Sequence, residues 1–368
     1  MIRCRRCLYP LGKPDLAFDE EGICSACRNF EARAEVDWET AAGDLLRVLD
    51  RSDGRVIVPS SGGKDSTYIA LRLKDLGADV TAVTATTCDL TPIGRRNIDN
   101  LARRVRTIEV TPNRSVRAKL NRLSLDMVGD PSWPEHVSIH RVPFRVARDM
   151  GVRTIFFGEC PNNQYGGPPG TEAIRTMTQR WASEFGGFLG LRAEDFIGVE
   201  GITARDMADY VAPGDAELSD AGVTAYFLGA FEPWDSHRNA RVAAEAGMGQ
   251  VLPGPMNWWQ HENLDNYQTA IHDFAMYRKF GYGRLTAQIS VDIRSGLISR
   301  DEALRIADAR DGLFPHHYLG EPIEAICGRM GVTVEGLIET LDRFTNWSLF
   351  SHVEDNRPIL KAEEKEAA

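Results

Sequence analysis

The chain has 368 residues, of which 43% are hydrophobic, and its formal net charge is −10. This length and composition predict a folded globular protein with two or three domains, and the acidic balance argues against a dedicated nucleic-acid binder, which needs a basic face. No stretch approaches the roughly 18 consecutive apolar residues of a membrane helix and no secretory signal is evident, so we expect a cytoplasmic protein.

The first segment, residues 1–37, is rich in cysteine. Two CxxC pairs are separated by sixteen residues, and their members are Cys4, Cys7, Cys24 and Cys27. This spacing is typical of zinc ribbons, in which four thiolates complete a closed tetrahedron around the metal. Such a short segment buries too little apolar surface to fold alone, so metal binding would supply its folding free energy. We predict structural zinc; an iron–sulfur cluster or a redox dithiol pair is the alternative.

Residues 38–255 read as an α/β domain. A helical pattern starts at Trp38, with Ala41, Leu45, Val48 and Leu49 on one face. Five apolar, β-rich runs follow, separated by helix-length segments, and they start at Val56, Asp79, Val105, Val152 and Val223. This alternation predicts a doubly wound, mostly parallel sheet covered on both faces, with ligands at the carboxyl ends of the strands.

Between Arg95 and Arg122 nine basic residues stand against two acidic ones. Such a run is most often a solvated helix face, and the alternative is a surface that faces an anionic substrate. Residues 256–368 form short amphipathic patterns that predict a helical C-terminal region, with Ser299, Glu321 and Thr333 as candidate helix caps.

The sequence "SGGKDS", residues 61–66, follows the first predicted strand and opens a helix. Its backbone N–H groups would therefore lie at the positive end of a helix dipole. Gly62 and Gly63 allow close approach of a phosphate, Ser61 and Ser66 offer hydroxyl groups, Lys64 can neutralise charge, and Asp65 could position magnesium. A plain turn is the alternative. The motif is not a Walker A loop, because Asp65 follows Lys64 where that loop has Ser or Thr.

This loop resembles that of the PP-loop ATP pyrophosphatases. Members of that superfamily bind ATP, cleave it between the α- and β-phosphates, and adenylate a carbonyl or amide oxygen so that nitrogen or sulfur can replace it. The resemblance implies a pyrophosphate site at Ser61, Gly62, Gly63, Asp65 and Ser66, and an adenine contact on the second strand near Val83 and Thr84.

A narrower resemblance extends over most of the chain. The blocks "CRRCLYP", "FDEEGICSACRNFE", "VPSSGGKDSTY", "FLGAFEPWDSHRNARVA", "NWWQHENLDN" and "IHDFAMYRKFGYGRLTAQ" are similar to the N-acetyl sugar amidotransferase family. That family converts an acetamido group of a sugar into an acetamidino group. The resemblance implies ATP, Mg²⁺ and structural Zn²⁺ as cofactors, and a separate glutaminase with a cyclase-like partner as the ammonia source.

Two blocks depart from the family pattern. Many members carry "CWPCH" where this chain has Ser132 to His136, and "GTYWNYENLD" where it has "GPMNWWQHENLD". The acceptor, a sugar or a related small molecule, is therefore open to change. We expect substrate contacts at Trp133, His136, His261 and Glu262. His136 and His140, four residues apart, are more typical of packing or a surface than of a metal site.

Two further predictions concern the chemistry. Glu159 directly follows an apolar strand, where α/β active sites form, so we expect a catalytic or orienting role beside Lys64 and Asp65. The competing hypothesis is a PP-loop sulfur transferase that thiolates a small molecule or tRNA through Cys160 or Cys88, although a buried free cysteine usually serves only as a small apolar residue. A pure binding module does not account for the intact loop.

Overall fold

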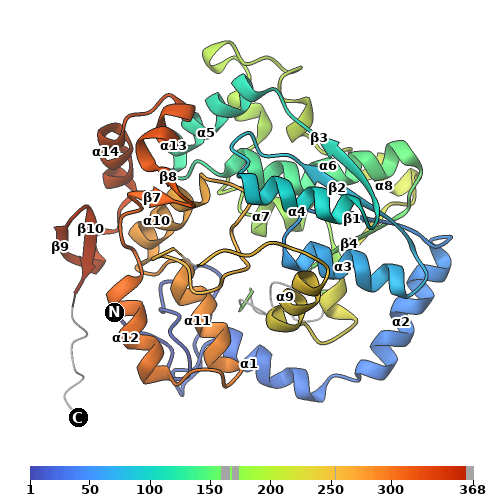
Figure 1. Cartoon of the computed structure of the whole chain (residues 1–368), viewed down its shortest axis with the longest axis horizontal. Helices are drawn as coiled ribbons and strands as arrows, with labels where there is room; N and C mark the ends of the chain where they lie inside the picture. The colour runs from blue at the N-terminus through green and yellow to red at the C-terminus, as the bar shows by residue number, and fades with distance from the viewer. Residues whose placement is uncertain (159–165, 168–173, 253, 362–368) are drawn as a thin grey trace.

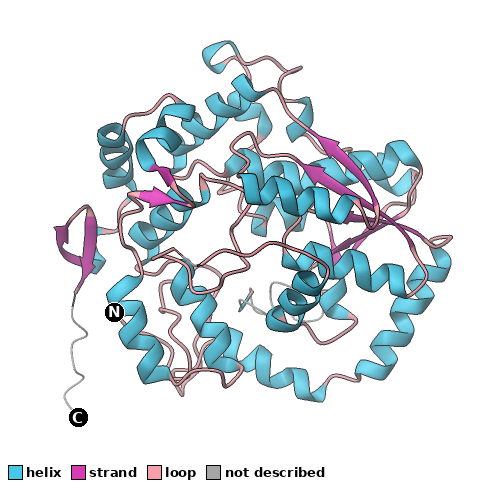
Figure 2. Ribbon diagram, in the orientation of Figure 1, coloured by secondary structure: helices cyan, strands magenta, loops and turns pink. Residues whose placement is uncertain are grey.

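The structure, a computed structural model, describes residues 1–158, 166–167, 174–252 and 254–361. Its largest sheet has six strands in the order β3-β2-β1-β4-β6-β5. Strands β1 to β4 lie on the right-hand side of Figure 1, and Figure 2 shows the strands in magenta. The strands are β1 (Arg55–Pro59), β2 (Asp79–Ala85), β3 (Arg106–Val110), β4 (Thr154–Phe157), β5 (Thr176–Met177) and β6 (Thr224–Phe227). Neighbours pair in parallel except β5, which runs antiparallel to β6. The predicted doubly wound α/β fold is confirmed, and the five predicted runs are strands β1, β2, β3, β4 and β6.

Helices cover both faces of the sheet because alternate strand residues point to opposite sides. Val56 and Val58 of β1 pack in one cluster with α2, α3 and α9, whereas Ile57 packs in another with α5, α6 and α7. The helices of this part of the chain are α2 (Trp38–Arg51), α3 (Lys64–Asp75), α4 (Pro92–Ala102), α5 (Arg114–Val128), α6 (Trp133–Met150), α7 (Gln179–Phe185), α8 (Asp215–Asp220) and α9 (Ser236–Glu245). Short 3₁₀ turns lie at Arg33–Glu35, Ala193–Phe196, Val199–Gly201, Ala208–Tyr210, Leu228–Ala230 and Trp347–Leu349.

The order of the strands places a crevice beside β1. From β1 the chain moves outward through β2 to β3, then returns by α5 and α6 to β4 on the other side of β1. Connections leaving β1 and β4 therefore diverge, and in open α/β sheets such a switch point is where ligands bind. The loop after β1, residues 60–63, lies at this point.

The C-terminal region is helical as predicted, with two hairpins that the sequence pattern does not reveal. Its elements are α10 (Thr269–Phe280), α11 (Arg284–Arg294), α12 (Arg300–Arg310), α13 (Ile323–Met330) and α14 (Val334–Phe344), with the pairs β7 (His317–Tyr318) and β8 (Glu321–Pro322), and β9 (Phe350–Glu354) and β10 (Arg357–Leu360). Ser299 and Thr333 cap helices as predicted. Glu321 does not, since it lies in β8 and pairs with Arg329.

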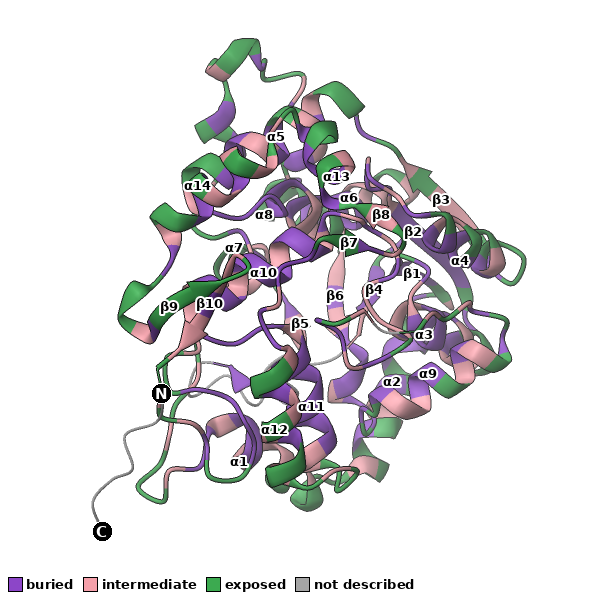
Figure 3. Ribbon diagram, turned by 60° about the vertical axis from the view of Figure 1, so that its left-hand side comes forward, coloured by how far each residue is buried: buried purple, intermediate pink, exposed green. Residues whose placement is uncertain are grey.

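The cysteine segment, with its helix α1 (Ser25–Ala32), packs against α11 and α12. Leu8 is buried with Leu285 and Ile289, and Arg3 pairs with Asp308 of α12 at 2.9 Å, so the N-terminus lies beside that helix (Figure 1). Figure 3 shows α11 buried along most of its length. The predicted boundaries at residues 37/38 and 255/256 stay predictions. No described helix is both long and apolar enough to cross a bilayer.

Candidate active site

The loop between β1 and α3 has a backbone that only glycine allows. Gly62 has a φ of +77°, and a Cβ there would lie 2.6 Å from the backbone nitrogen of Ile98. The Gly62 N–H donates to Ser60 Oγ at 3.0 Å, and Ser60 Oγ also contacts Ser66 Oγ at 3.0 Å. No described side chain caps the start of α3 at Gly63. Its first N–H groups are left for a ligand, as anion binding at a helix N-terminus requires.

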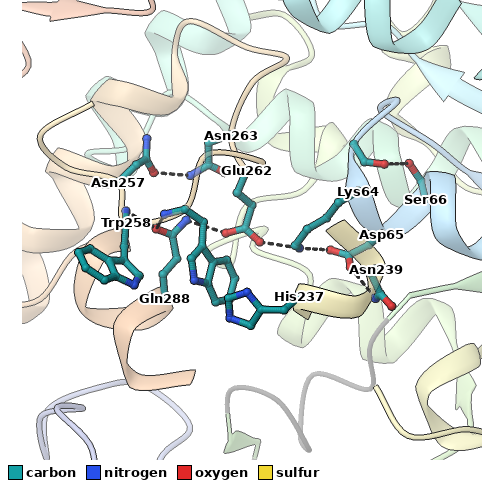
Figure 4. A network of polar contacts seen from close by, with 12 residues as sticks. Lys64, Asp65, Ser66, His237, Asn239, Asn257, Trp258, Glu262, Asn263 and Gln288 are labelled. Carbon is teal, nitrogen blue, oxygen red and sulfur yellow. Dashed lines mark hydrogen bonds and ion pairs between the residues drawn. The ribbon is translucent and has the colours of Figure 1, made fainter. Parts of the chain in front are cut away.

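Lys64 is held between two carboxylates (Figure 4). Its side chain is 2% exposed, and Nζ donates to Glu262 Oε1 at 2.8 Å and to the carboxylate of the adjacent Asp65. Asn239 of α9 donates to Asp65 Oδ1 at 2.9 Å, and Gln288 of α11 donates to Glu262 Oε2 at 2.7 Å. The network therefore connects the loop after β1 and the start of α3 to α9 and to the C-terminal helices.

The electrostatics of this network keep Lys64 and Glu262 charged. Burial alone lowers the pKa of Lys64, but the charges of Asp65 and Glu262 outweigh burial and raise it above its usual value. Burial alone raises the pKa of Glu262, but Lys64 and Arg284 outweigh it and lower that pKa to about 2. A buried ion pair between the Lys64 ammonium and the Glu262 carboxylate results.

We expect Glu262→Gln to destabilise the fold. The change removes one of the two charges that compensate the buried Lys64, so the free energy of unfolding should fall by about 1–3 kcal/mol. Because the folded pKa of Glu262 lies below its unfolded value, this loss should be full at neutral pH and should shrink as the pH falls toward 2. Urea unfolding at pH 7 measures this change in the free energy of unfolding. Glu354→Gln, on an exposed strand, is the control, and an equal effect of both changes would contradict the interpretation.

A cavity of about 440 Å³ opens beside the loop, within the size range of small-molecule sites. The loop after β1 lines one side, the first two turns of α6 and the end of β4 line another, and residues 261–266 with α10 and Arg284 of α11 close it. Three parts of the chain that are distant in sequence thus form one pocket at the switch point of the sheet.

The structure brings most of the predicted site residues to this cavity. Ser61, Gly63, Lys64, Asp65, Ser66, His136, His261 and Glu262 line it, and Gly62 shapes the loop. His261 stacks on Trp259 with ring centroids 5.4 Å apart. Its Nε2 is buried without a hydrogen-bond partner among the described residues, and burial lowers its pKa to about 4. A neutral imidazole therefore adjoins Lys64.

Trp133 does not reach the cavity, which corrects the predicted substrate contact. It is 1% exposed, and its ring packs against Phe196 and Tyr210 at centroid distances of 4.4 and 5.9 Å. Its place in the first turn of α6 turns the indole toward the hydrophobic core, whereas His136, three residues later, lines the pocket.

Val83 and Thr84 also lie away from the cavity, buried within β2. Instead, Ala85 at the end of that strand and Thr87 beyond it form the lining. Glu159 and Cys160 lie outside the described residues. Gly158, which directly precedes them, lines the cavity at the end of β4.

One buried ion pair beside the cavity is not apparent from the sequence. Arg117 belongs to the basic run, yet it is 1% exposed and donates to Glu135 Oε1 at 3.0 Å and to Tyr210 Oη at 2.9 Å. Asn121 donates to the other oxygen of Glu135 at 2.8 Å. Glu135, which stands where the resembling family has a cysteine, is thus fixed in the cavity wall. For Arg117, the interpretation of the basic residues between Arg95 and Arg122 as a solvated helix face is therefore wrong.

The four N-terminal cysteines form a compact, buried group. Their sulfur atoms all lie within 4.8 Å of one another, with Cys4 Sγ 3.9 Å from Cys27 Sγ and Cys7 Sγ 3.6 Å from Cys24 Sγ. A tetrahedron with Zn–S bonds of about 2.3 Å has S–S edges of about 3.8 Å, so the donor set fits zinc.

Comparisons with known proteins give one family match and matches among solved structures. A family model described as "LPS biosynthesis protein WbpG-like, C-terminal domain" matches residues 261–362. No curated protein matches the chain. Among solved structures, a predicted subunit of tRNA methyltransferase from Methanocaldococcus jannaschii DSM is 13% identical, with 63% of this chain and 90% of that chain covered and a TM-score of 0.29. The matched family region begins at His261 and so contains the C-terminal wall of the cavity, including Glu262 and Arg284.

Proposed function

We propose that this protein is a PP-loop ATP-dependent amidotransferase that acts on an N-acetylated sugar or a related small molecule. It would convert an acetamido group into an amidine and release AMP and pyrophosphate. One observation carries the proposal: the uncapped, glycine-shaped loop opens into the same cavity as the C-terminal region that matches a lipopolysaccharide-biosynthesis family. The loop supplies phosphate binding, and the family match favours a sugar acceptor.

In the first step the acceptor's amide oxygen would attack the α-phosphorus of ATP, and pyrophosphate would leave. The N–H groups at the start of α3 and the hydroxyls of Ser61 and Ser66 face that departing charge, and Lys64 can neutralise part of it. The carboxylate of Asp65 is a suitable magnesium ligand by its oxygen chemistry. The protein's part in this step is to align the amide oxygen with the phosphate.

In the second step ammonia would add to the activated carbon and AMP would leave. Water in the pocket would restore the amide, so the cavity has to exclude it. The ammonia would come from a separate glutaminase and cyclase-like partner. At the N-terminus we propose a structural zinc ion on the four cysteines, with no open position for a substrate.

Sulfur transfer remains the second hypothesis. Cys88, one of its two candidate thiols, does not line the cavity, and burial raises its pKa above the usual value. Since the thiolate is the nucleophile, Cys88 is poorly suited to that role. Cys160 is outside the described residues, and a direct product analysis distinguishes the two reactions.

The test is an incubation of the full chain with MgATP, ammonium chloride and a panel of N-acetylated sugars, free and nucleotide-linked. We expect AMP and pyrophosphate, formed only with acceptor. The product should be about one dalton lighter than the acceptor, because NH replaces O. Release of ADP would contradict the PP-loop mechanism. A gain of about sixteen daltons in the presence of a sulfur donor would establish thiolation instead.

A further inference from the structure

Three histidines form part of the wall of the cavity that the loop after β1 also lines. His136 and His140 lie one turn apart on α6, and His272 lies on α10. The rings of His136 and His272 meet edge to face, with centroids 5.1 Å apart. His140 stacks on Phe157 of β4 at 5.8 Å. The three imidazoles are thus fixed beside the place where the acceptor would lie.

The hydrogen bonds of these rings decide which nitrogen carries the proton. His136 Nδ1 lies 3.1 Å from the carbonyl oxygen of Gly187, and His140 Nδ1 lies 2.8 Å from the carbonyl oxygen of His136. A carbonyl only accepts, so Nδ1 is the donor in both rings. His272 Nδ1 donates in the same way to the buried carboxylate of Asp130 at 2.8 Å.

In each of these cavity-lining residues Nε2 is therefore outside the hydrogen bond of the ring. In a neutral imidazole that atom is a hydrogen-bond acceptor. No group in the described part of the chain donates to any of the three Nε2 atoms. Burial lowers the pKa of His136 and of His140 to about 4, which keeps both rings neutral at pH 7.

His272 differs from the other two in basicity. Burial alone lowers its pKa, but the charge and hydrogen bond of Asp130 outweigh burial and raise it. Asp273 acts in the same direction, whereas Arg284 of α11 opposes it. The wall therefore contains two neutral rings, His136 and His140, and one more basic ring, His272. Asp130 is the positioning residue of His272.

The chemistry of this wall selects its ligand. The three histidines do not form a metal site. Among the described residues, the four cysteines are the group of ligating side chains whose atoms lie close enough together, within 4.8 Å, to hold a metal ion. An anion is a poor ligand for the neutral rings, because the anion and their Nε2 atoms are both hydrogen-bond acceptors. A small molecule with several N–H groups matches the wall, because Nε2 of His136 and Nε2 of His140 can each accept one hydrogen bond, and Nε2 of His272 can accept one in its neutral form.

We propose that this histidine wall, His136, His140 and His272, binds ammonia, which is in equilibrium with ammonium in solution, and that His272 is the catalytic base for its attack. This inference rests on the proposed function. The ammonia lone pair forms the new C–N bond at the adenylated carbon. Nε2 of neutral His272 takes one proton from the resulting ammonium centre, and the C–O bond breaks with its electron pair leaving on AMP. The product is an amidinium ion.

The binding part is tested without an acceptor. The full chain is labelled with ¹⁵N in its histidine rings and titrated with ammonium chloride, against sodium chloride at equal ionic strength. We expect saturable shifts of the three Nε2 signals with ammonium alone, while the exposed His316 and His352 respond equally to both salts. Absence of an ammonium-specific shift would overturn the site, and so would a shift seen only with zinc chloride.

The catalytic part is tested with His272→Gln in the product assay. We expect ammonium-dependent turnover to fall by about 10²-fold, as for loss of a general base, with the KM for ATP unchanged. Asp130→Asn, which keeps the side-chain shape, should lower the rate in the same direction, and His352→Gln is the matched control. Normal amidine formation by both the His272→Gln and the Asp130→Asn protein would overturn the role of His272. Ammonium binding without amidine from wild type would refute the proposed function and leave the binding site standing.

Discussion

Replacing Asp65 by alanine is expected to reduce pyrophosphate release by about 10²–10³-fold, the scale seen when one group that stabilises transition-state charge is removed. The carboxylate lies in the first turn of α3, at the mouth of the loop, with its oxygens oriented by Lys64 and Asn239. Of the loop side chains it is the one able to ligate magnesium as an anion. The measurement is pyrophosphate release with MgATP, ammonium and the acceptor found in the product assay.

The same change should leave the chain folded. Asp65 is about a quarter exposed, and its removal leaves Lys64 paired with Glu262 at 2.8 Å. Circular dichroism and a melting curve check this. Asp75→Ala, at the exposed last turn of the same helix, is the matched control and should keep full activity. Turnover by the Asp65→Ala protein at the wild-type rate would refute a metal or phosphate role for this carboxylate.

Much of the fold could be predicted from local pattern. Each of the five parallel strands is an apolar run flanked by helix-length segments, and the glycine-rich loop follows the first of them. The two-residue strands β5, β7 and β8 are too short to show a period of two, so no pattern indicates them. Glu321 resembles a cap because acidic residues favour helix starts, yet the hairpin places it one residue too early.

The site was less predictable because its contacts join distant parts of the chain. Glu262 lies 198 residues after Lys64, and nothing local shows that one compensates the other. Arg117 reads as a surface residue within a basic run, and its burial depends on Glu135 and Tyr210 reaching it from α6 and a later turn. His272 gains significance only because α10 packs beside α6 and brings it to His136.

The double substitution Cys4→Ser and Cys24→Ser is expected to have the largest effect on stability. A structural zinc ion contributes about 10–16 kcal/mol of apparent binding free energy, and in so short a segment that energy is folding energy. Cys4 belongs to the first CxxC pair and lies beside Cys27, and Cys24 belongs to the second and lies beside Cys7. The change therefore removes one metal ligand from each CxxC pair. We expect loss of bound zinc by elemental analysis and a much lower urea midpoint.

The loss should extend to the active site, because α11 connects the two. Its residues Ala287 and Ser290 pack on the cysteine segment, where Ser290 accepts a hydrogen bond from the Leu8 backbone at 3.2 Å. Gln288, which lies between these two residues on the helix, donates a hydrogen bond to Glu262, and Glu262 pairs with Lys64. Disorder in residues 1–37 should therefore weaken MgATP binding in isothermal titration, although no cysteine of the group lines the cavity. Cys88→Ser, outside the group, should retain zinc and the wild-type midpoint. Full zinc content or an unchanged midpoint in the double variant would refute a structural metal centre here.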